Sequence, residues 1–174
     1  GKSVGVSMRF NIIDSNECIE VFTTRPDTIF GASFMTLAPE HRLVLKICSN
    51  EKKKEIQEYI TSASNRSEKD RLSEVNKITG VFTGAYAEHP FSKEKIPIWV
   101  GDYVLATYGT GAVMSVPCGD QRDYDFARFF NINIPNIFKD KDISEQAFVD
   151  KDNFELINSS FLEIGRAHVW TPVT

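Results

Sequence analysis

The residues that bind metals or form disulfides are scarce in this chain. It has three cysteines and three histidines among 174 residues. Cys18, Cys48 and Cys118 form no CxxC pair, and their odd number does not fit a disulfide framework. The histidines show no HExxH spacing, so the supply of zinc ligands is poor. These shortages argue against a disulfide-rich secreted domain and a metal enzyme, and they favour a reducing, cytoplasmic environment.

Long apolar runs and an excess of basic charge are also missing. No apolar run approaches the roughly 20 residues needed to span a bilayer, and the first ten residues do not resemble a signal peptide. The net charge is −4, whereas a domain that grips a nucleic-acid backbone by itself is usually basic. We therefore expect no membrane contact and, at most, contact with a short nucleic-acid end.

What is present is a 41% hydrophobic composition and many short strand-like segments. Alternating apolar residues predict strands over 4–10 and 18–24, paired as a hairpin, and another strand over 32–37. Pro39 suits the first turn of a helix that would run to about Cys48. A second helix is predicted over 52–64, and the polar segment 64–76 fits a loop or a short helix.

The second half of the chain is predicted to continue the sheet. The strands expected there are 81–86, 96–100, 103–107 and 112–116. A helix over 121–130 follows, and 133–152 is expected to be irregular, with a possible strand near Ile137. Many strands with a few inserted helices predict an α/β, barrel-like domain rather than a regular βαβ fold.

The segment 110–127 combines an apolar strand, a Pro117-Cys118-Gly119 turn and the start of a helix. Asp120 suits the N-cap of that helix, and Asp123 lies three residues on, near a capping-box position. Two roles stay open for these carboxylates: capping the helix, or holding the ammonium group of a substrate.

The segment 23–28 (TTRPDT) follows a predicted strand and contains three threonines beside Arg25. Pro26-Asp27 is typical of a turn. A polar turn is the simpler interpretation. Alternatively, the hydroxyls position a water molecule, and a stiff β-branched threonine limits the size of a bound side chain.

Two other motifs are weaker. Tyr108-Gly109-Thr110-Gly111 lacks the third glycine and the following helix of a dinucleotide-binding fingerprint, so we interpret it as a tight turn with Tyr108 able to stack on a base. Cys118 near a helix N-terminus could be a nucleophile with His89 as its base, although no sequence rule links the two.

Together the TTRPDT string, the 80–84 turn and the 103–127 segment resemble the editing domain (connective polypeptide 1) of bacterial-type leucyl-tRNA synthetases. The resemblance covers 1–162 and implies a β-barrel decorated by helices. The implied activity is metal-free hydrolysis of mischarged leucine tRNA, for example its norvaline, isoleucine or methionine esters. The implied partners are the tRNA 3′ end and the rest of a monomeric synthetase. ATP and Mg²⁺ would serve only the parent ligase, and no cofactor is expected here.

The resemblance also implies roles for individual residues. Asp123 would bind the substrate α-amino group, and Thr28 would exclude leucine. Thr23 and Thr24 would line the catalytic site and help to position water and ribose. The other implied substrate contacts are Met114 and Val116 in the side-chain pocket, Tyr108 and Arg122 at the terminal adenosine or its phosphate, and Asp120, Arg25 and Asp27 around them.

One position departs from the family pattern. The family commonly has His where Gly119 stands in this chain. Two alternatives to hydrolysis therefore stay open: a module that binds the tRNA 3′ end without cleaving it, and an inert truncated fragment. The segment 163–174 resembles a translated sequencing adapter, so we expect one editing domain over 1–162 followed by a non-native tail.

Overall fold

The computed structural model describes residues 4–164 of the chain, and the expected non-native segment lies almost wholly outside them. The chain divides into two compact units. Among the described residues, unit 1 contains 4–6, 23–33 and 115–164, and unit 2 contains 7–22 and 34–114. Each unit is built from segments distant in sequence, so motifs that are far apart along the chain can meet in one unit.

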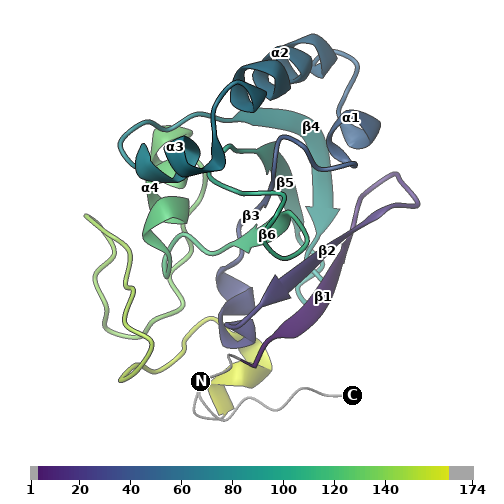
Figure 1. Cartoon of the computed structure of the whole chain (residues 1–174). Helices are drawn as coiled ribbons and strands as arrows, with labels where there is room; N and C mark the ends of the chain where they lie inside the picture. The colour runs from purple at the N-terminus through teal and green to yellow at the C-terminus, as the bar shows by residue number, and fades with distance from the viewer. Residues whose placement is uncertain (1–3, 165–174) are drawn as a thin grey trace. The chain divides into compact units, whose positions relative to one another are not determined.

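Unit 2 contains most of the β-structure (Figure 1). The predicted hairpin is confirmed by β1 (Val6–Asn11) and β2 (Cys18–Thr23), which form a two-stranded sheet. A four-stranded sheet has the order β4-β5-β3-β6. Its strands are β3 (Phe34–Leu37), β4 (Val81–Glu88), β5 (Lys95–Val100) and β6 (Ala112–Ser115).

The pairing within the larger sheet is mixed. β4 pairs antiparallel with β5, and β3 pairs parallel with β5 in the register Met35–Ile98 to Leu37–Val100. All four residues of β3 are buried, as expected for a central strand covered on both faces. The architecture is thus mixed α/β with two sheets. The strands between residues 4 and 164 do not close into a barrel, so the barrel-like part of the prediction is not confirmed.

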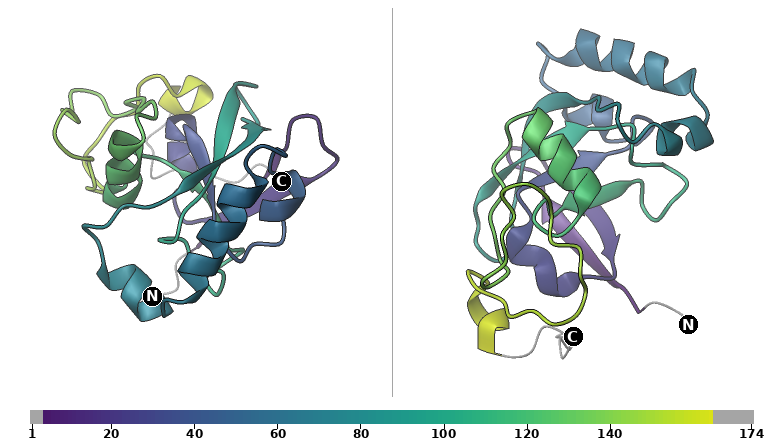
Figure 2. Two further views of the ribbon diagram at one scale, coloured as in Figure 1. Left: turned by 90° about the horizontal axis from the view of Figure 1, so that it is seen from above. Right: turned by 90° about the vertical axis from the view of Figure 1, so that its left-hand side faces the viewer.

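The helices of unit 2 are α1 (Val44–Ile47), α2 (Lys53–Ser64) and α3 (Glu68–Ser73). α2 packs against both α1 and β4, and Figures 1 and 2 show it beside them. The predicted stripe of α2 is anchored by Ile56, which is fully buried. Ser67 is the N-cap of α3 and its side chain accepts the Asp70 N–H, so the segment 64–76 contains a short helix.

Two of the predicted elements are wrong. The helix predicted from Pro39 is limited to α1, because residues 38–43 form turns in which the His41 ring accepts the Leu43 N–H. The strand predicted over 103–107 is a loop, although Val104 and Leu105 are buried as a strand's apolar residues would be. An apolar segment that is buried through loop packing looks the same in sequence as a strand.

Unit 1 contains the short 3-10 helix η1 (Pro26–Gly31), helix α4 (Gln121–Phe129) and the 3-10 turn η2 (Ser160–Ile164). Residues 131–159, which we call the arm, form long loops after α4 (Figure 1). Three aromatic rings of the arm, Phe138, Phe148 and Phe154, contact one another edge to face or tilted. The arm is irregular as predicted, and near Ile137 it has only a single bridge, from Phe138 to Leu156.

Candidate functional site

The turn at 23–28 is folded by its own hydroxyls. Thr23 Oγ1 accepts the Arg25 N–H at 3.0 Å. Thr28 donates both its backbone N–H, at 3.1 Å, and its hydroxyl, at 2.8 Å, to the Arg25 carbonyl. Pro26 sits in the first turn of η1, where its missing N–H costs nothing. The threonines therefore shape the turn itself, and Thr28 is only 4% exposed.

The fixed hydroxyl of Thr28 has a consequence for its methyl group. A threonine side chain occupies one of three staggered positions. Since the hydroxyl is committed to the Arg25 carbonyl, the methyl group is committed as well. The methyl group of Thr28 is thus held in one orientation.

Arg25 and Asp27, predicted as substrate contacts, bind each other. Nε and Nη2 of Arg25 each lie 3.2 Å from a different oxygen of Asp27, which is a two-point ion pair. The Arg25 guanidinium also lies 5.6 Å from the centre of the Phe154 ring. This contact from the arm was not foreseen, because Phe154 stands in a polar, irregular segment with no pattern to single it out.

The second motif begins where β6 ends. Asp120 is the N-cap of α4, as predicted, and its Oδ1 accepts the Asp123 N–H at 2.9 Å. Asp123 is 7% exposed, and its Oδ2 accepts the Val116 N–H at 3.0 Å. The carboxylate of Asp123 therefore ties the turn after β6 to the first turn of the helix.

The segment that follows the 23–28 motif packs on the end of β6 and the turn after it, within unit 1. The Ser33 N–H donates to the Ser115 carbonyl at 3.1 Å. Gly31 packs so closely on the second motif that an added Cβ would lie 3.0 Å from Val116 Cγ1 and 3.2 Å from Cys118 Sγ. A side chain at this position would push on its neighbours, so glycine suits the close approach here, although its φ is not positive.

The remaining predicted site residues differ in exposure and in unit. Thr24 and Asp120 are exposed, Thr23 and Arg122 are half-buried, and Val116 is buried, all in unit 1. Met114 and Tyr108 belong to unit 2, where Met114 is buried and Tyr108 is 68% exposed. An aromatic side chain that exposed is available to stack on a base.

The structure gives no support to a cysteine nucleophile. Cys118 is fully buried, and burial raises the pKa of its thiol from 9.0 to about 11, so the thiolate is disfavoured at neutral pH. His89 is buried in unit 2, and its Nδ1 accepts the backbone N–H groups of Phe91 and Ser92. His89 thus caps a turn.

Among residues 4–164, no three histidine, cysteine, aspartate or glutamate side chains are grouped as metal ligands would be. Over the same residues, no helix is both long and apolar enough to cross a membrane.

Gly119 lies beside the Phe138 ring. A Cβ added at Gly119 would lie 3.4 Å from that ring.

Comparison with known proteins identifies the family. The model of the leucyl-tRNA synthetase editing domain matches residues 1–167. The chain belongs to this family. It is 60% identical over 162 residues to the leucine–tRNA ligase of Christiangramia forsetii, and 60% identical over 167 residues to that of Flavobacterium johnsoniae.

A solved structure gives the same assignment. The crystal structure of the ternary complex of an Agrobacterium radiobacter K84 LeuRS with tRNA and LeuAMS has a TM-score of 0.67 and 34% identity, covering 76% of this chain and 16% of that one. The two curated ligases are matched over 93% of this chain, but over only 17% and 18% of their own lengths. The chain thus spans less than a fifth of the length of these two ligases.

Proposed function

We propose that this editing domain hydrolyses the ester that joins a wrong amino acid to leucine tRNA. The observation that carries the proposal is that unit 1 contains both the Thr28 turn, fixed by its own hydrogen bonds, and the buried Asp123 carboxylate at the start of α4. One segment offers a fixed apolar surface, and the other offers a negative charge. A substrate that carries an α-ammonium group beside a side chain of variable size needs both.

In the proposed mechanism Asp123 binds the α-ammonium group, and Thr28 limits the side chain. Water attacks the ester carbonyl carbon, the bond from that carbon to the ribose oxygen breaks, and the ribose oxygen takes up a proton. The products are the amino acid and uncharged tRNA. Thr23 and Thr24 line the reacting centre and help to position water and ribose. We propose that this positioning, which can supply about 7–11 kcal/mol of the barrier reduction, drives the hydrolysis without a metal ion.

Selectivity follows from sterics. A pocket that separates two side chains differing by one methylene through binding alone gains only about 1–3 kcal/mol of discrimination. Rejecting leucine by a rigid methyl group avoids that limit, because the cognate product does not fit. Norvaline, isoleucine and methionine are the proposed substrates. Met114 and Val116, both buried and apolar, are proposed to line the side-chain pocket.

The tRNA contacts are proposed on the same basis. Tyr108 is proposed to stack on the terminal adenosine, and Arg122 to contact the adenosine or its phosphate. Asp120 supports Asp123 by capping α4, while Arg25 and Asp27, which pair with each other beside the Thr28 turn, are proposed as further substrate contacts. Because the domain carries a net charge of −4, we propose that the main grip on tRNA lies in the rest of a monomeric, cytoplasmic parent synthetase, which also holds ATP and Mg²⁺.

The test is release of amino acids from leucine tRNA charged with isoleucine or with leucine, using this chain. The expected result is release of isoleucine alone, lost in Asp123→Ala. A folded chain that hydrolyses neither ester but still binds the charged tRNA would overturn the proposal in favour of a 3′-end binding module. The feature that favours this second candidate is Gly119, where the family commonly has His.

A further inference from the structure

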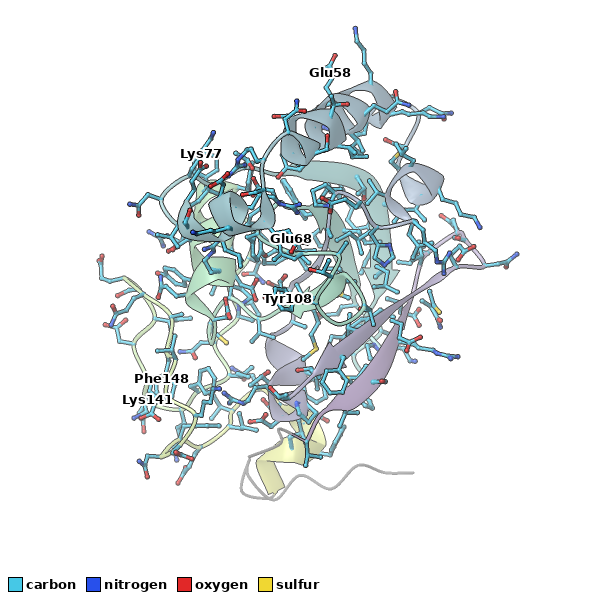
Figure 3. The ribbon with its side chains drawn as sticks, viewed as in Figure 1. Glu58, Glu68, Lys77, Tyr108, Lys141 and Phe148 are labelled. Carbon is cyan, nitrogen blue, oxygen red and sulfur yellow. The ribbon has the colours of Figure 1, made fainter. Side chains whose placement is uncertain are left out.

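The loop between β5 and β6, residues 101–111, carries Tyr108 outward on unit 2. The Tyr108 side chain is exposed, and Figure 3 labels it together with Glu68 of α3. An exposed tyrosine in a loop has many conformations available to it, and ordering it on binding costs entropy. Hydrogen bonds from neighbouring segments fix the backbone of this loop at several residues.

Arg71 of α3 is the centre of this attachment. Its side chain is 4% exposed, and its three nitrogens have three different partners. Nε donates to the Asp102 carbonyl at 2.9 Å, and Nη2 donates to the Val104 carbonyl at 3.0 Å. Nη1 pairs with Glu40 at 2.5 Å, which balances the buried charge. Two of the three partners are therefore backbone groups of the Tyr108 loop.

Other groups of α2 and α3 hold the same loop. The Tyr59 hydroxyl accepts the Asp102 N–H at 2.9 Å, and Arg66 pairs with the Asp102 carboxylate. Nearer Tyr108, the Thr107 hydroxyl donates to Glu68 at 2.8 Å. The N–H, carbonyl and carboxylate of Asp102 are thus all engaged by this helical segment.

The far end of the loop is fixed as well. The Gly111 N–H donates to the Tyr108 carbonyl at 3.1 Å, and the Gly111 carbonyl accepts the Ala38 N–H at 2.8 Å. Gly111 has a φ of 73°, a conformation that favours glycine. Tyr108 therefore lies in a turn whose entry is held by Arg71 and whose exit is held next to β3.

We propose that Arg71 is a positioning residue for Tyr108, setting the loop so that the exposed ring is ready to receive the terminal adenosine. This inference rests on the proposed function, because the adenosine is the ligand proposed there. Arg71 acts through the loop backbone and touches no substrate. A guanidinium is required, because its planar fork reaches two carbonyls and a carboxylate at once, whereas lysine is a point charge.

The first experiment tests the loop directly, without any tRNA. Hydrogen exchange is measured at the amides of 102–111 and, as an internal control, at those of β5 in the same molecule. In Arg71→Lys, which keeps the charge beside Glu40, exchange over 102–111 is expected to rise about tenfold or more, with β5 unchanged. Equal exchange in both proteins would overturn the proposal.

The second experiment measures hydrolysis of isoleucine-charged leucine tRNA by the same chain. Arg71→Lys is expected to raise KM about tenfold and to change kcat less than about twofold, because the ring contributes to binding. Thr107→Val removes only the exposed hydroxyl contact with Glu68, so it provides a second test of loop positioning if Arg71 variants fold poorly. It is expected to shift KM in the same direction but by a smaller factor.

A double-mutant cycle separates positioning from general weakening of the fold. In a Tyr108→Ala background, Arg71→Lys is expected to have little further effect on KM, since the ring it positions is gone. If the two substitutions instead change KM independently, so that their fold-changes multiply in the double variant, the proposal is overturned. If the parent chain hydrolyses no ester, the proposed function fails, and the exchange experiment alone still decides whether Arg71 orders the loop.

Discussion

The carboxylate of Asp123 accepts the backbone N–H of Val116 at 3.0 Å, joining the first turn of α4 to the end of β6. The residue proposed to bind the substrate ammonium is thus also a structural link. A variant that loses activity could therefore have lost either role. The first prediction separates them.

Asp123→Asn keeps a carbonyl oxygen that can accept the Val116 N–H but loses the negative charge. It is expected to abolish release of isoleucine while lowering the free energy of unfolding by less than about 1 kcal/mol. Asp123→Ala leaves a buried N–H without its acceptor and is expected to cost about 1–3 kcal/mol. Urea denaturation and tRNA deacylation measure the two effects. Asp125→Asn, on the same helix, is the control, and a fully active Asp123→Asn would contradict the ammonium-binding role.

Thr28 has a hydroxyl that fixes the turn and a methyl group proposed to exclude leucine, and two substitutions divide these roles. Thr28→Ser keeps the bond to the Arg25 carbonyl and removes the methyl group, so it is expected to release leucine from leucine tRNA at near-normal stability. Thr28→Val keeps the bulk, loses the hydrogen bond, and is expected to reject leucine while losing about 1 kcal/mol of stability. Leucine release by Thr28→Val but not by Thr28→Ser would assign the exclusion to the hydroxyl.

Gly31 and Gly119 provide a matched pair for the packing between the two motifs. A Cβ at position 31 would lie 3.0 Å from Val116 Cγ1, whereas at position 119 it would lie 3.4 Å from the Phe138 ring, an ordinary contact. Gly31→Ala is therefore expected to destabilise the fold by about 1–3 kcal/mol through overpacking. Gly119→Ala is expected to change stability by less than about 0.5 kcal/mol. Equal losses of stability in the two variants would show that the close approach of Gly31 is unimportant.

Cys118 gives a prediction at alkaline pH. Its folded pKa of about 11 lies above the ordinary 9.0, so between these values the unfolded chain loses its proton first. Ionisation then favours unfolding, and stability is expected to fall as the pH rises from 9 to 11. Cys118→Ala is expected to lose less stability over that range and to keep hydrolysing isoleucine-charged tRNA. Loss of hydrolysis in a folded Cys118→Ala variant would instead support Cys118 as a nucleophile.

The sequence predicted the local elements where a pattern was regular. The hairpin, α2, β4, β5 and α4 were each recognisable from alternation, helical period or an N-cap such as Asp120. The loop at 103–107 was mistaken for a strand, because Val104 and Leu105 are buried by tertiary packing with no ladder of hydrogen bonds. Hydrogen bonds between distant segments, such as those from Arg71 to the loop carbonyls, cannot be predicted from local sequence patterns.

The site was predictable to a similar degree. TTRPDT and the Asp120–Asp123 turn stood out as dense polar motifs, and the structure brings both into unit 1. Their partners did not stand out: the Val116 N–H is a backbone group, and Phe154 lies in an irregular arm. The roles of the individual site residues stay predictions.

The cation–π contact between Arg25 and Phe154 joins residues from nearly opposite ends of the described chain. A contact of such large sequence separation requires closure of a long loop, and the entropy cost of that closure slows folding. During synthesis the TTRPDT turn leaves the ribosome long before the arm does. The Arg25–Asp27 pair can form as soon as the turn has been synthesised. The Phe154 ring that packs on Arg25 is added only when the arm has been synthesised. We therefore expect the turn to become fully ordered only when this part of the chain is complete.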